Sequence, residues 1–243
     1  MIDVAVCIQI RDGNTRLPGK GSKMLRGKPI YEHMIENVDR CINFINNHKI
    51  KKNVQAQLIL LVPFDEYKDW CLRVSNLGKN IKVFSGEEGQ NSDVLERFKK
   101  VFKILKPNYI VRLTGDCPFI PSALINKIIT CASNHKLDYI SNVDEELRTM
   151  PDGFDVECIS DECFLWLSER NVSESDKEHV TTHIRSNVQP WMRIATISSI
   201  FDTSDYKYSI DTKEDFAEIE KRIRLKQKKD KLAKSKGYGI YEF

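Results

Sequence analysis

A cationic, glycine-bearing loop follows the first apolar run of the chain. Residues 4–8 read Val-Ala-Val-Cys-Ile, which predicts a buried strand, and the loop spans residues 9–20. Its charged and flexible residues are Arg11, Gly13, Arg16, Gly19 and Lys20. Two arginines and a lysine this close together can surround a polyanion, and glycines let the backbone approach it closely. The composition favours a triphosphate-binding loop, with an ordinary basic surface turn as the alternative.

Two aspartates could hold a divalent cation. Asp116 comes after Gly115 and the expected strand at 109–113, so it is expected at the carboxyl end of that strand, within reach of a cation that also binds phosphate. Mg²⁺ usually takes one or two protein carboxylates, with water and phosphate completing its ligands. Asp211, at the end of another short apolar segment, offers the second carboxylate. The alternatives are a turn at Asp116 and capping of the last helix by Asp211 or Thr212.

A histidine pair occurs later in the chain. His179 and His183 have the i, i+4 spacing that places two side chains on one face of a helix. The spacing is superficially that of a helical metal pair, but the H-E-x-x-H pattern of zinc hydrolases is absent. We interpret His179 first as a structural or interface residue, and the alternatives are a substrate contact and a zinc site.

The alternation of apolar runs and helical segments predicts the scaffold that must position these residues. Strands are expected near 3–10, 58–62, 81–84, 109–113 and 138–140, and helices near 29–42, 63–77, 93–105 and 122–133. Pro29 is expected at the first helical position. This order predicts an α/β protein with a doubly wound, mostly parallel sheet and right-handed crossovers. Ligands of such sheets bind beyond the carboxyl ends of the strands, where the cationic loop and Asp116 would both lie.

The second half of the chain changes character after Asn142. Residues 154–158 alternate in polarity, which predicts a half-exposed strand with Asp155 and Glu157 on its outer face. Helices are expected near 160–169 and 175–186, a strand near 192–197, and an amphipathic helix from Lys213. We expect a single domain, with halves at 1–142 and 143–212 followed by a basic helix and tail at 213–243.

Composition narrows the class of protein. Apolar residues make up 41% and charged residues 30% of the 243 residues, which is typical of a globular protein. No stretch approaches the roughly 20 uninterrupted apolar residues of a membrane span, and the first residues lack the basic region of a signal peptide. The seven cysteines are scattered and never spaced as C-x-x-C. This favours reduced thiols in the cytoplasm over a disulfide framework or a zinc site.

The net charge of +3 hides a basic C-terminal segment. Residues 221–236 carry nine Lys or Arg and one Asp, a local charge of +8, so the other 227 residues sum to −5. A mildly acidic body does not match the broad basic face of a nucleic-acid-binding protein, and we expect no nucleic-acid partner. The segment is interpreted as a solvated helix end, with contact to an acidic surface or partner as the alternative.

Seven motifs occur in a fixed order and together are more specific than any one of them. They are Q-x-R-x-G-x-T-R-L-P-G-K at 9–20, L-x-G-K-P at 25–29, V-L-E-R at 94–97, T-G-D-C-P at 114–118, D-G-F-D-V-E at 152–157, E-H-V-T at 178–181 and D-T-x-E-D at 211–215. With them the chain resembles the cytidylyltransferases of spore-coat polysaccharide type, relatives of the CMP-KDO and CMP-sialic acid synthetases. The resemblance runs from Gln9 to Asp215, about 85% of the chain.

The resemblance implies a nucleotide-diphospho-sugar-transferase-like fold that activates an acceptor with CTP. By matching to the family, the nucleotide would contact Gln9, Arg11, Gly13, Arg16, Gly19, Lys20, Thr114 and Gly115. Asp116 and Asp211 would be the ligands of Mg²⁺, with Mn²⁺ as an alternative. The acceptor half of the site would contain Arg148, Asp152, Asp155 and Glu157, and His179 is added as a candidate contact. A cytoplasmic homodimer that meets through residues 145–185 is expected by the same analogy.

Three positions depart from the family pattern. Asn14 stands where serine is usual, Asp12 where an apolar residue is usual, and Lys213 where proline is usual. None of them removes a charge that the phosphates need. Asp12, however, would add a negative charge beside those phosphates.

The expected reaction is attack of an acceptor oxygen on the α-phosphorus of CTP, with pyrophosphate as the leaving group. Lys20 and Arg11 would stabilise the phosphates during the reaction, and a hydroxyl acceptor would need a general base, for which Asp155 is the first candidate. Two other functions compete with this one. A glycosyltransferase of the same general fold would normally carry an Asp-x-Asp pair, whereas residue 118 is proline, and a non-catalytic nucleotide-binding protein would not need both carboxylates.

Overall fold

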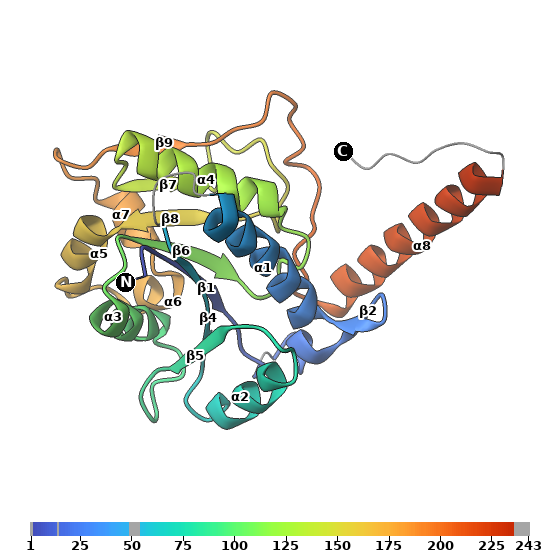
Figure 1. Ribbon diagram of the computed structural model, residues 1–243, viewed down its shortest axis with the longest axis horizontal. Coiled ribbons are helices and arrows are strands. Elements are labelled where there is room, and N and C mark those ends of the chain that lie inside the picture. The colour runs from blue at the N-terminus through green and yellow to red at the C-terminus, as the bar shows by residue number, and fades with distance from the viewer. Residues whose placement is uncertain (1, 14, 49–53, 236–243) are drawn as a thin grey trace.

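A seven-stranded sheet runs through the centre of the protein, in the order β5-β4-β1-β6-β8-β7-β9 (Figure 1). The computed structural model describes residues 2–13, 15–48 and 54–235. The strands are β1 (Val4–Gln9), β4 (Ala56–Val62), β5 (Ile81–Ser85), β6 (Tyr109–Thr114), β7 (Tyr139–Ser141), β8 (Glu157–Ser160) and β9 (Ile194–Thr196). All of them run in one direction except β8, which is antiparallel to both β6 and β7. The predicted mostly parallel sheet is confirmed.

Helices pack on both faces of this sheet. One face is covered by α1 (Ile30–His48), α2 (Tyr67–Ser75) and α4 (Ser122–His135), and the other by α3 (Val94–Leu105), α5 (Asp161–Ser168), α6 (Glu174–His179) and α7 (Thr182–Ser186). In β1, Val4, Val6 and Ile8 pack on the first side, whereas Ala5 and Cys7 pack on the second. Side chains alternate across a strand, so a strand covered on both faces has to be apolar throughout. The predicted doubly wound arrangement follows from these continuous apolar runs.

The predicted half-exposed strand at 154–158 is wrong. Strand β8 begins only at Glu157, and all four of its residues are buried. The segment before it pairs with a side chain instead of a strand: Asn142 donates its side-chain N–H to the Phe154 carbonyl and accepts a hydrogen bond from the Val156 N–H, both at 2.8 Å. The inserted strand lies between β6 and β7. Its position in the centre of the sheet buries both of its faces, which the polar alternation did not predict.

A short hairpin follows the cationic loop. It consists of β2 (Met24–Leu25) and β3 (Lys28–Pro29), preceded by a single 3-10 turn, η1 (Lys20–Ser22). Pro29 therefore belongs to the hairpin, and α1 begins one residue later than predicted. The loop, the hairpin and the last helix, α8 (Lys213–Ser235), share an apolar cluster formed by Leu17, Leu25, Ile30, Ile210 and Ile219. This cluster joins the N-terminal loop to the C-terminal helix.

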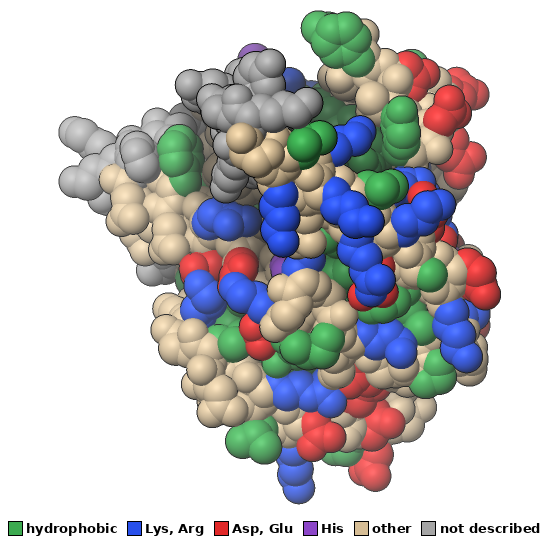
Figure 2. Space-filling model, turned by 90° about the vertical axis from the view of Figure 1, so that its right-hand side faces the viewer, with side chains coloured by type: hydrophobic (Ala, Val, Ile, Leu, Met, Phe, Trp, Pro, Cys, Tyr) green, Lys and Arg blue, Asp and Glu red, His purple; other side chains and the backbone are tan. Residues whose placement is uncertain are grey.

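Helix α8 begins at Lys213, as predicted, and its distal part projects from the body (Figure 1). Figure 2 shows many Lys and Arg side chains on the face from which this helix projects. The tail at 236–243 lies outside the described residues. Among the described residues, no helix combines the length and the apolar character that a membrane crossing requires.

Candidate active site

A cleft of about 220 Å³ opens at the carboxyl ends of β1 and β6. The loop after β1, the turn after β6, α3, α6 and the segment before α8 contribute to its walls. The predicted site residues that line it are Gln9, Arg11, Arg16, Lys20, Thr114, Gly115, Asp116, His179 and Asp211. Residues from five separate segments are thus brought to the edge of the sheet where ligands of this architecture bind.

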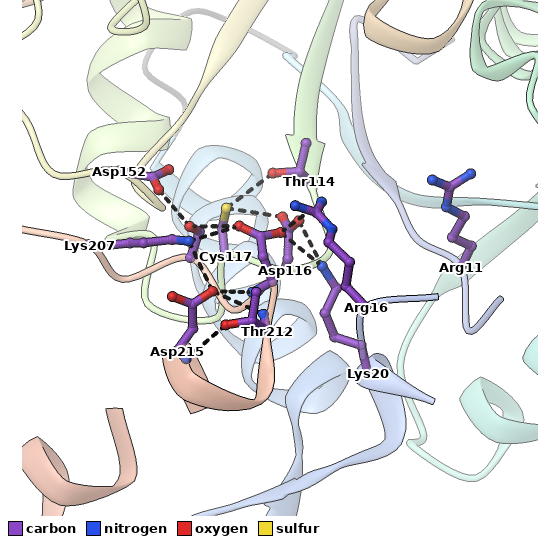
Figure 3. A network of polar contacts seen from close by, with 12 residues as sticks. Arg11, Arg16, Lys20, Thr114, Asp116, Cys117, Asp152, Lys207, Thr212 and Asp215 are labelled. Atoms are coloured by element: carbon purple, nitrogen blue, oxygen red, sulfur yellow. Dashed lines mark hydrogen bonds and ion pairs between the residues drawn. The ribbon is translucent and has the colours of Figure 1, made fainter. Parts of the chain in front are cut away.

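One ammonium group bridges the two carboxylates proposed to hold a metal (Figure 3). Lys20 Nζ lies 3.0 Å from Asp116 Oδ2 and 3.4 Å from Asp211 Oδ1. The Lys20 side chain is only 9% exposed, and the two carboxylate side chains are 25% and 21% exposed. The backbone holds the two acidic residues together, because the Ile210 N–H donates to the Asp116 carbonyl at 2.9 Å. Residues 95 positions apart in the sequence therefore form one anionic pair around one cation.

The environment of Asp116 keeps its carboxylate ionised. Burial raises its pKa, but the charge of Lys20 and the hydrogen bonds from Lys20 and Thr114 outweigh this effect and hold the pKa below its ordinary value. An ionised carboxylate is what a hard divalent cation requires. Within the described residues, no cluster of three or more His, Cys, Asp or Glu side chains could hold a metal. A two-carboxylate site fits Mg²⁺ that receives its other ligands from water and phosphate.

The start of α8 leaves the side chain of Asp211 available to the cleft. Thr212 Oγ1 accepts a hydrogen bond from the Asp215 N–H at 3.1 Å, and the Asp215 carboxylate accepts from the N–H groups of both Asp211 and Thr212 at 3.0 Å. These contacts satisfy the N–H groups that a helix start leaves open. Lys207 Nζ lies 3.3 Å from the second oxygen of Asp211 and 2.9 Å from Asp215. Thr212 and Asp215 therefore cap the helix, and Asp211 lines the cleft.

The first half of the cationic loop is held by a carboxylate from the segment before α2. Glu66 accepts hydrogen bonds from the Asp12 N–H at 3.0 and 2.8 Å and from the Gly13 N–H at 2.9 Å. The Trp70 indole N–H also donates to Glu66, at 2.9 Å. Gly13 was predicted to contact the nucleotide, but its N–H already has a partner and it does not line the cleft. We call these contacts the Glu66 clamp.

The extra negative charge at Asp12 is neutralised within the protein. Its carboxylate forms an ion pair with Arg73 of α2, and the Arg73 guanidinium stacks 4.6 Å from the Trp70 ring centre. Asp12 therefore faces α2, away from the cationic end of the cleft. Gly19, which also does not line the cleft, adopts a left-handed backbone with φ 64° and turns the chain into η1. Asn14 lies outside the described residues.

The wall opposite the carboxylate pair is built by α3 and α6. Arg11, drawn apart from the polar network in Figure 3, forms an ion pair with Glu178 of α6 at 3.2 Å. His179 lines the cleft at the end of α6. The chain then breaks at Val180, where φ is 60° and the Thr181 N–H closes a tight turn onto the His179 carbonyl at 2.7 Å. Such a backbone costs about 1–3 kcal/mol in a β-branched residue, and it fixes His179 at the wall.

This break separates the two predicted histidines. His179 ends α6, whereas His183 lies on α7, where its ring is 5.6 Å from Trp166 and its Nδ1 is 3.5 Å from Asp176. The single helix expected at 175–186 is therefore wrong, and the two rings do not share a helical face. The i, i+4 spacing has no metal-binding consequence here.

Sequence reasoning assigned no role to Arg97, although it lines the cleft from α3. Its side chain is 1% exposed and lies on the buried face of the helix with Val94, Phe98 and Val101. The available signal was an arginine at a position where helical periodicity calls for an apolar residue. Arg112, Glu66 and Lys207 were also missed, because their partners come from distant segments.

The predicted acceptor residues form a second group beside Asp211. Asp152 accepts a hydrogen bond from Ser209 Oγ at 2.7 Å, and this hydroxyl lies 3.3 Å from Asp211 Oδ2. Arg148 forms an ion pair with Asp155 at 2.6 Å. Burial raises the pKa of Asp155, and the charge of Arg148 opposes this shift. These residues do not line the cleft itself but adjoin it through Asp211.

Glu157 is not part of this group. It is 2% exposed and lies beneath the cleft, where it contacts Arg112 and the Tyr139 hydroxyl. Arg112 in turn donates to Gln9 Oε1 at 3.0 Å. Burial raises the pKa of Glu157, but Arg112 and the hydrogen bonds to the carboxylate hold it below its ordinary value. The structure thus places Glu157 as an internal ion-pair partner that supports the cleft floor.

Comparison with known proteins decides the family. The family model described as "Cytidylyltransferase" matches residues 5–237. The chain belongs to the cytidylyltransferase family. The spore coat polysaccharide biosynthesis protein SpsF of Bacillus subtilis is 28% identical over 221 residues, which cover 90% of this chain and 85% of that protein. The expected nucleotidyltransferase activity is thereby confirmed at the level of the family.

Solved structures of cytidylyltransferases share the fold. A cytidylyltransferase from Leptospira borgpetersenii superimposes with a TM-score of 0.74 at 23% identity and covers all of both chains. A CMP:2-keto-3-deoxy-manno-octonic acid synthetase, solved as a complex with CTP, has a TM-score of 0.63 at 12% identity over 92% of this chain and 99% of its own. At these low sequence identities, the similarity shows that this cytidylyltransferase shares their fold, and it shows nothing more.

The Glu66 clamp generates a first prediction. Replacing Glu66→Gln should speed hydrogen exchange at the amides of residues 12 and 13 by about 10- to 100-fold, because a hydrogen bond to a charged group contributes about 1.5–3 kcal/mol. Native-state hydrogen exchange followed by mass spectrometry measures this. The fluorescence of Trp70 should shift as well, because its indole loses a charged partner.

Asp65→Asn is the matched control, since Asp65 is the exposed neighbour of Glu66 in the sequence. It should leave the exchange of both amides unchanged. Unchanged exchange in Glu66→Gln would show that the clamp does not hold the loop.

Proposed function

We propose that this cytidylyltransferase transfers CMP from CTP to an anionic small-molecule acceptor and releases pyrophosphate. The observation that carries the proposal is the Asp116–Asp211 pair, bridged by Lys20 and joined at 3.9 Å by Arg16. Cations gathered around two carboxylates match the alternating charges of a metal–triphosphate complex. A site for a single phosphate would not need both carboxylates.

The reaction forms a bond between an acceptor oxygen and the α-phosphorus and breaks the bond from that phosphorus to the bridging oxygen. The pyrophosphate departs with the bonding electron pair, so negative charge grows on the leaving group. Arg16 and Lys20 would bind and neutralise this charge, with Arg11 as a further predicted contact. Gln9, Thr114 and Gly115 would orient the nucleotide from the strand ends.

Asp116 and Asp211 would hold Mg²⁺, or Mn²⁺ in its place. When bound, the ion would supply charge neutralisation at the phosphate oxygens and would align the two reacting groups. The residues present fit this ion, because the pair offers two hard oxygen ligands and the substrate would supply others. Lys20 would exchange its carboxylate contacts for phosphate oxygens when CTP is bound.

The acceptor would bind beside Asp211, near Arg148, Asp152 and Asp155. A phosphomonoester acceptor needs no base, since its oxygen is largely ionised at neutral pH. A hydroxyl acceptor needs one, and Asp155 is the candidate because burial raises its pKa towards the range of a useful base. Phosphorylated sugars, polyols or amino acids and sugar acids all fit a group that combines Arg148 with carboxylates. His179 stays a candidate contact, whereas Glu157 is buried beneath the cleft as the partner of Arg112.

The proposed setting is surface polysaccharide synthesis or modification in the cytoplasm. The relative in Bacillus subtilis carries a name from polysaccharide biosynthesis. All seven cysteines are free thiols, and five of them are buried in the apolar core clusters of the two sheet faces, which suits a reducing compartment.

The proposed reaction predicts pyrophosphate release only with the right combination of substrates. A panel that pairs CTP, UTP, ATP and GTP with phosphorylated sugars, polyols, amino acids and sugar acids in the presence of Mg²⁺ should give release with CTP and one acceptor class. Asp116→Asn should lower kcat by at least about 100-fold, because it removes one of the few protein ligands of the cation. A coupled pyrophosphate assay measures both effects.

Asp69→Asn is the control for Asp116→Asn, since Asp69 is an exposed carboxylate on α2. Its activity should equal that of the unmodified enzyme. Absence of pyrophosphate with every acceptor would sink the proposed reaction, and near-normal turnover of Asp116→Asn would refute the role of this residue.

A homodimer is proposed as well. The interface at residues 145–185, expected from the resemblance, stays a prediction. Apolar side chains are exposed just after that region, on the edge strand β9 and the segment that follows it, where Ile194 is 38%, Ile200 93% and Phe201 72% exposed. Apolar surface of this kind often marks a protein interface. Light scattering should give twice the chain mass, and the double variant Ile200→Asp, Phe201→Asp should give one chain mass with an unchanged circular dichroism spectrum. A monomeric unmodified protein would contradict the proposal.

A further inference from the structure

The distal part of α8 concentrates positive charge on a projecting element. Residues 221–235 contain eight Lys or Arg and one Asp, a local charge of +7. The apolar contacts of the helix with the body come from its first turns, where Phe216, Ile219 and Ile223 join the cluster around Leu17. Among the described residues of α8, Gln227 is the last one to line the groove that the helix shares with the β2–β3 hairpin. The turns beyond it stand clear of the body (Figure 1).

The cations at the two ends of this segment differ in their partners. At its start, Glu218 forms ion pairs with Lys221 at 3.6 Å and with Arg222 at 3.0 Å. Three exposed cations of the last turns have no ion pair within the described part of the chain: Lys228, Lys229 and Lys231. Like charges at neighbouring positions of a helix repel each other. An anionic surface would relieve this repulsion.

Two exposed leucines lie on the side of α8 that faces away from the body. Leu225 and Leu232 are seven residues apart, which places them on one face, and they are 50% and 55% exposed. Leu225 comes two residues after Ile223 and therefore points about 200° around the helix from it. Lys228 and Lys229 follow Leu225 by three and four residues, so they border the leucines. We call these four residues the outer face of α8.

The chemistry of the outer face distinguishes among its possible partners. A second copy of the helix would carry the same charge and be repelled. Protein interfaces are enriched in arginine and depleted in lysine, whereas every cation of the chain from residue 226 onwards is lysine. Lysine is a compact charge on a flexible stem, which suits mobile anionic groups better than fixed planar ones. A nucleic acid would also meet the mildly acidic body of the protein.

We propose that the outer face of α8 docks this protein on the surface of a bilayer that contains anionic lipids. Leu225 and Leu232 enter the boundary between headgroups and acyl chains, while the lysines extend to the phosphates of the headgroups. Basic clusters of this size on a helix are typical of binding to anionic lipids. The contact is peripheral, since none of the described helices could span a membrane. The inference goes beyond the proposed function and does not rest on it.

Co-sedimentation of the full chain with lipid vesicles tests the docking surface. The unmodified protein should bind vesicles of phosphatidylcholine with about 30% phosphatidylglycerol, and should not bind phosphatidylcholine alone. The triple variant Lys228→Gln, Lys229→Gln, Lys231→Gln should bind the anionic vesicles about 100-fold more weakly, because each lysine near such a surface contributes a factor of about five. The double variant Leu225→Gln, Leu232→Gln should lose at least about tenfold, because it removes the apolar contact.

The matched control is the triple variant Lys68→Gln, Lys103→Gln, Lys127→Gln, which removes the same charge from exposed positions on α2, α3 and α4. It should bind the anionic vesicles like the unmodified protein, and all variants should melt at the temperature of the unmodified protein.

Three results would overturn the proposal. Absence of binding to the anionic vesicles would exclude the docking surface. Equal losses in the two lysine triples would make the attraction a property of net charge and not of α8. Unchanged binding by the leucine variant would make the helix a site for any polyanion, such as a nucleic acid or an acidic protein. Pyrophosphate release is measured without vesicles, so failure of the proposed function would be a separate result.

Discussion

The attraction between Lys20 and the Asp116–Asp211 pair is the interaction on which the site depends. Two carboxylates brought this close together repel each other, and partial burial strengthens the repulsion, so a cation must lie between them. The fold supplies the two acids from the turn after β6 and from the segment before α8, and the cation from the loop after β1. Behind them, Leu17, Ile210 and Ile219 join these segments in one apolar cluster. The electrostatic arrangement is thus fixed by packing that lies outside the cleft.

The two halves of the cationic loop have different partners. Lys20 and Arg16 face the carboxylate pair, while the first half of their loop is pulled the other way by Glu66 and Arg73. The Glu66 clamp takes over amides that would otherwise attract phosphate, and Arg73 neutralises Asp12. One loop therefore turns Arg16 and Lys20 of its second half towards the carboxylate pair, while Glu66 holds the amides of residues 12 and 13 in its first half.

Much of the scaffold could be predicted because its strands are covered on both faces. The runs at 4–8 and 58–62 contain no polar residue, so their length and apolar content identify them as strands that are covered on both faces. The carboxylate pair could also be predicted, since each aspartate follows a strand-like segment and lies in one of the motifs that occur in a fixed order along the chain. By contrast, nothing local marks β8 as a central antiparallel strand, because Glu157 reads as a surface residue until Arg112 and Tyr139 are placed beside it.

Other features depend on contacts that no local pattern records. Glu66 looks like an ordinary residue before a helix, and its role appears only when the loop 53 residues earlier folds against it. The break at Val180 is a backbone conformation that its β-branched side chain disfavours, so periodicity predicted one helix where there are two. The predictions from the sequence failed where residues far apart in the chain pair with each other and where the backbone is locally strained. Both situations occur around the cleft.

A crystal structure with CTP and Mn²⁺ tests the central claim most directly. The account predicts an anomalous manganese peak within about 2.5 Å of a carboxylate oxygen of both Asp116 and Asp211, the distance range of carboxylate ligands to hard cations. It also predicts that Lys20 Nζ has moved from the carboxylates to a phosphate oxygen. A manganese ion bound elsewhere, with Lys20 still bridging the two aspartates, would contradict it.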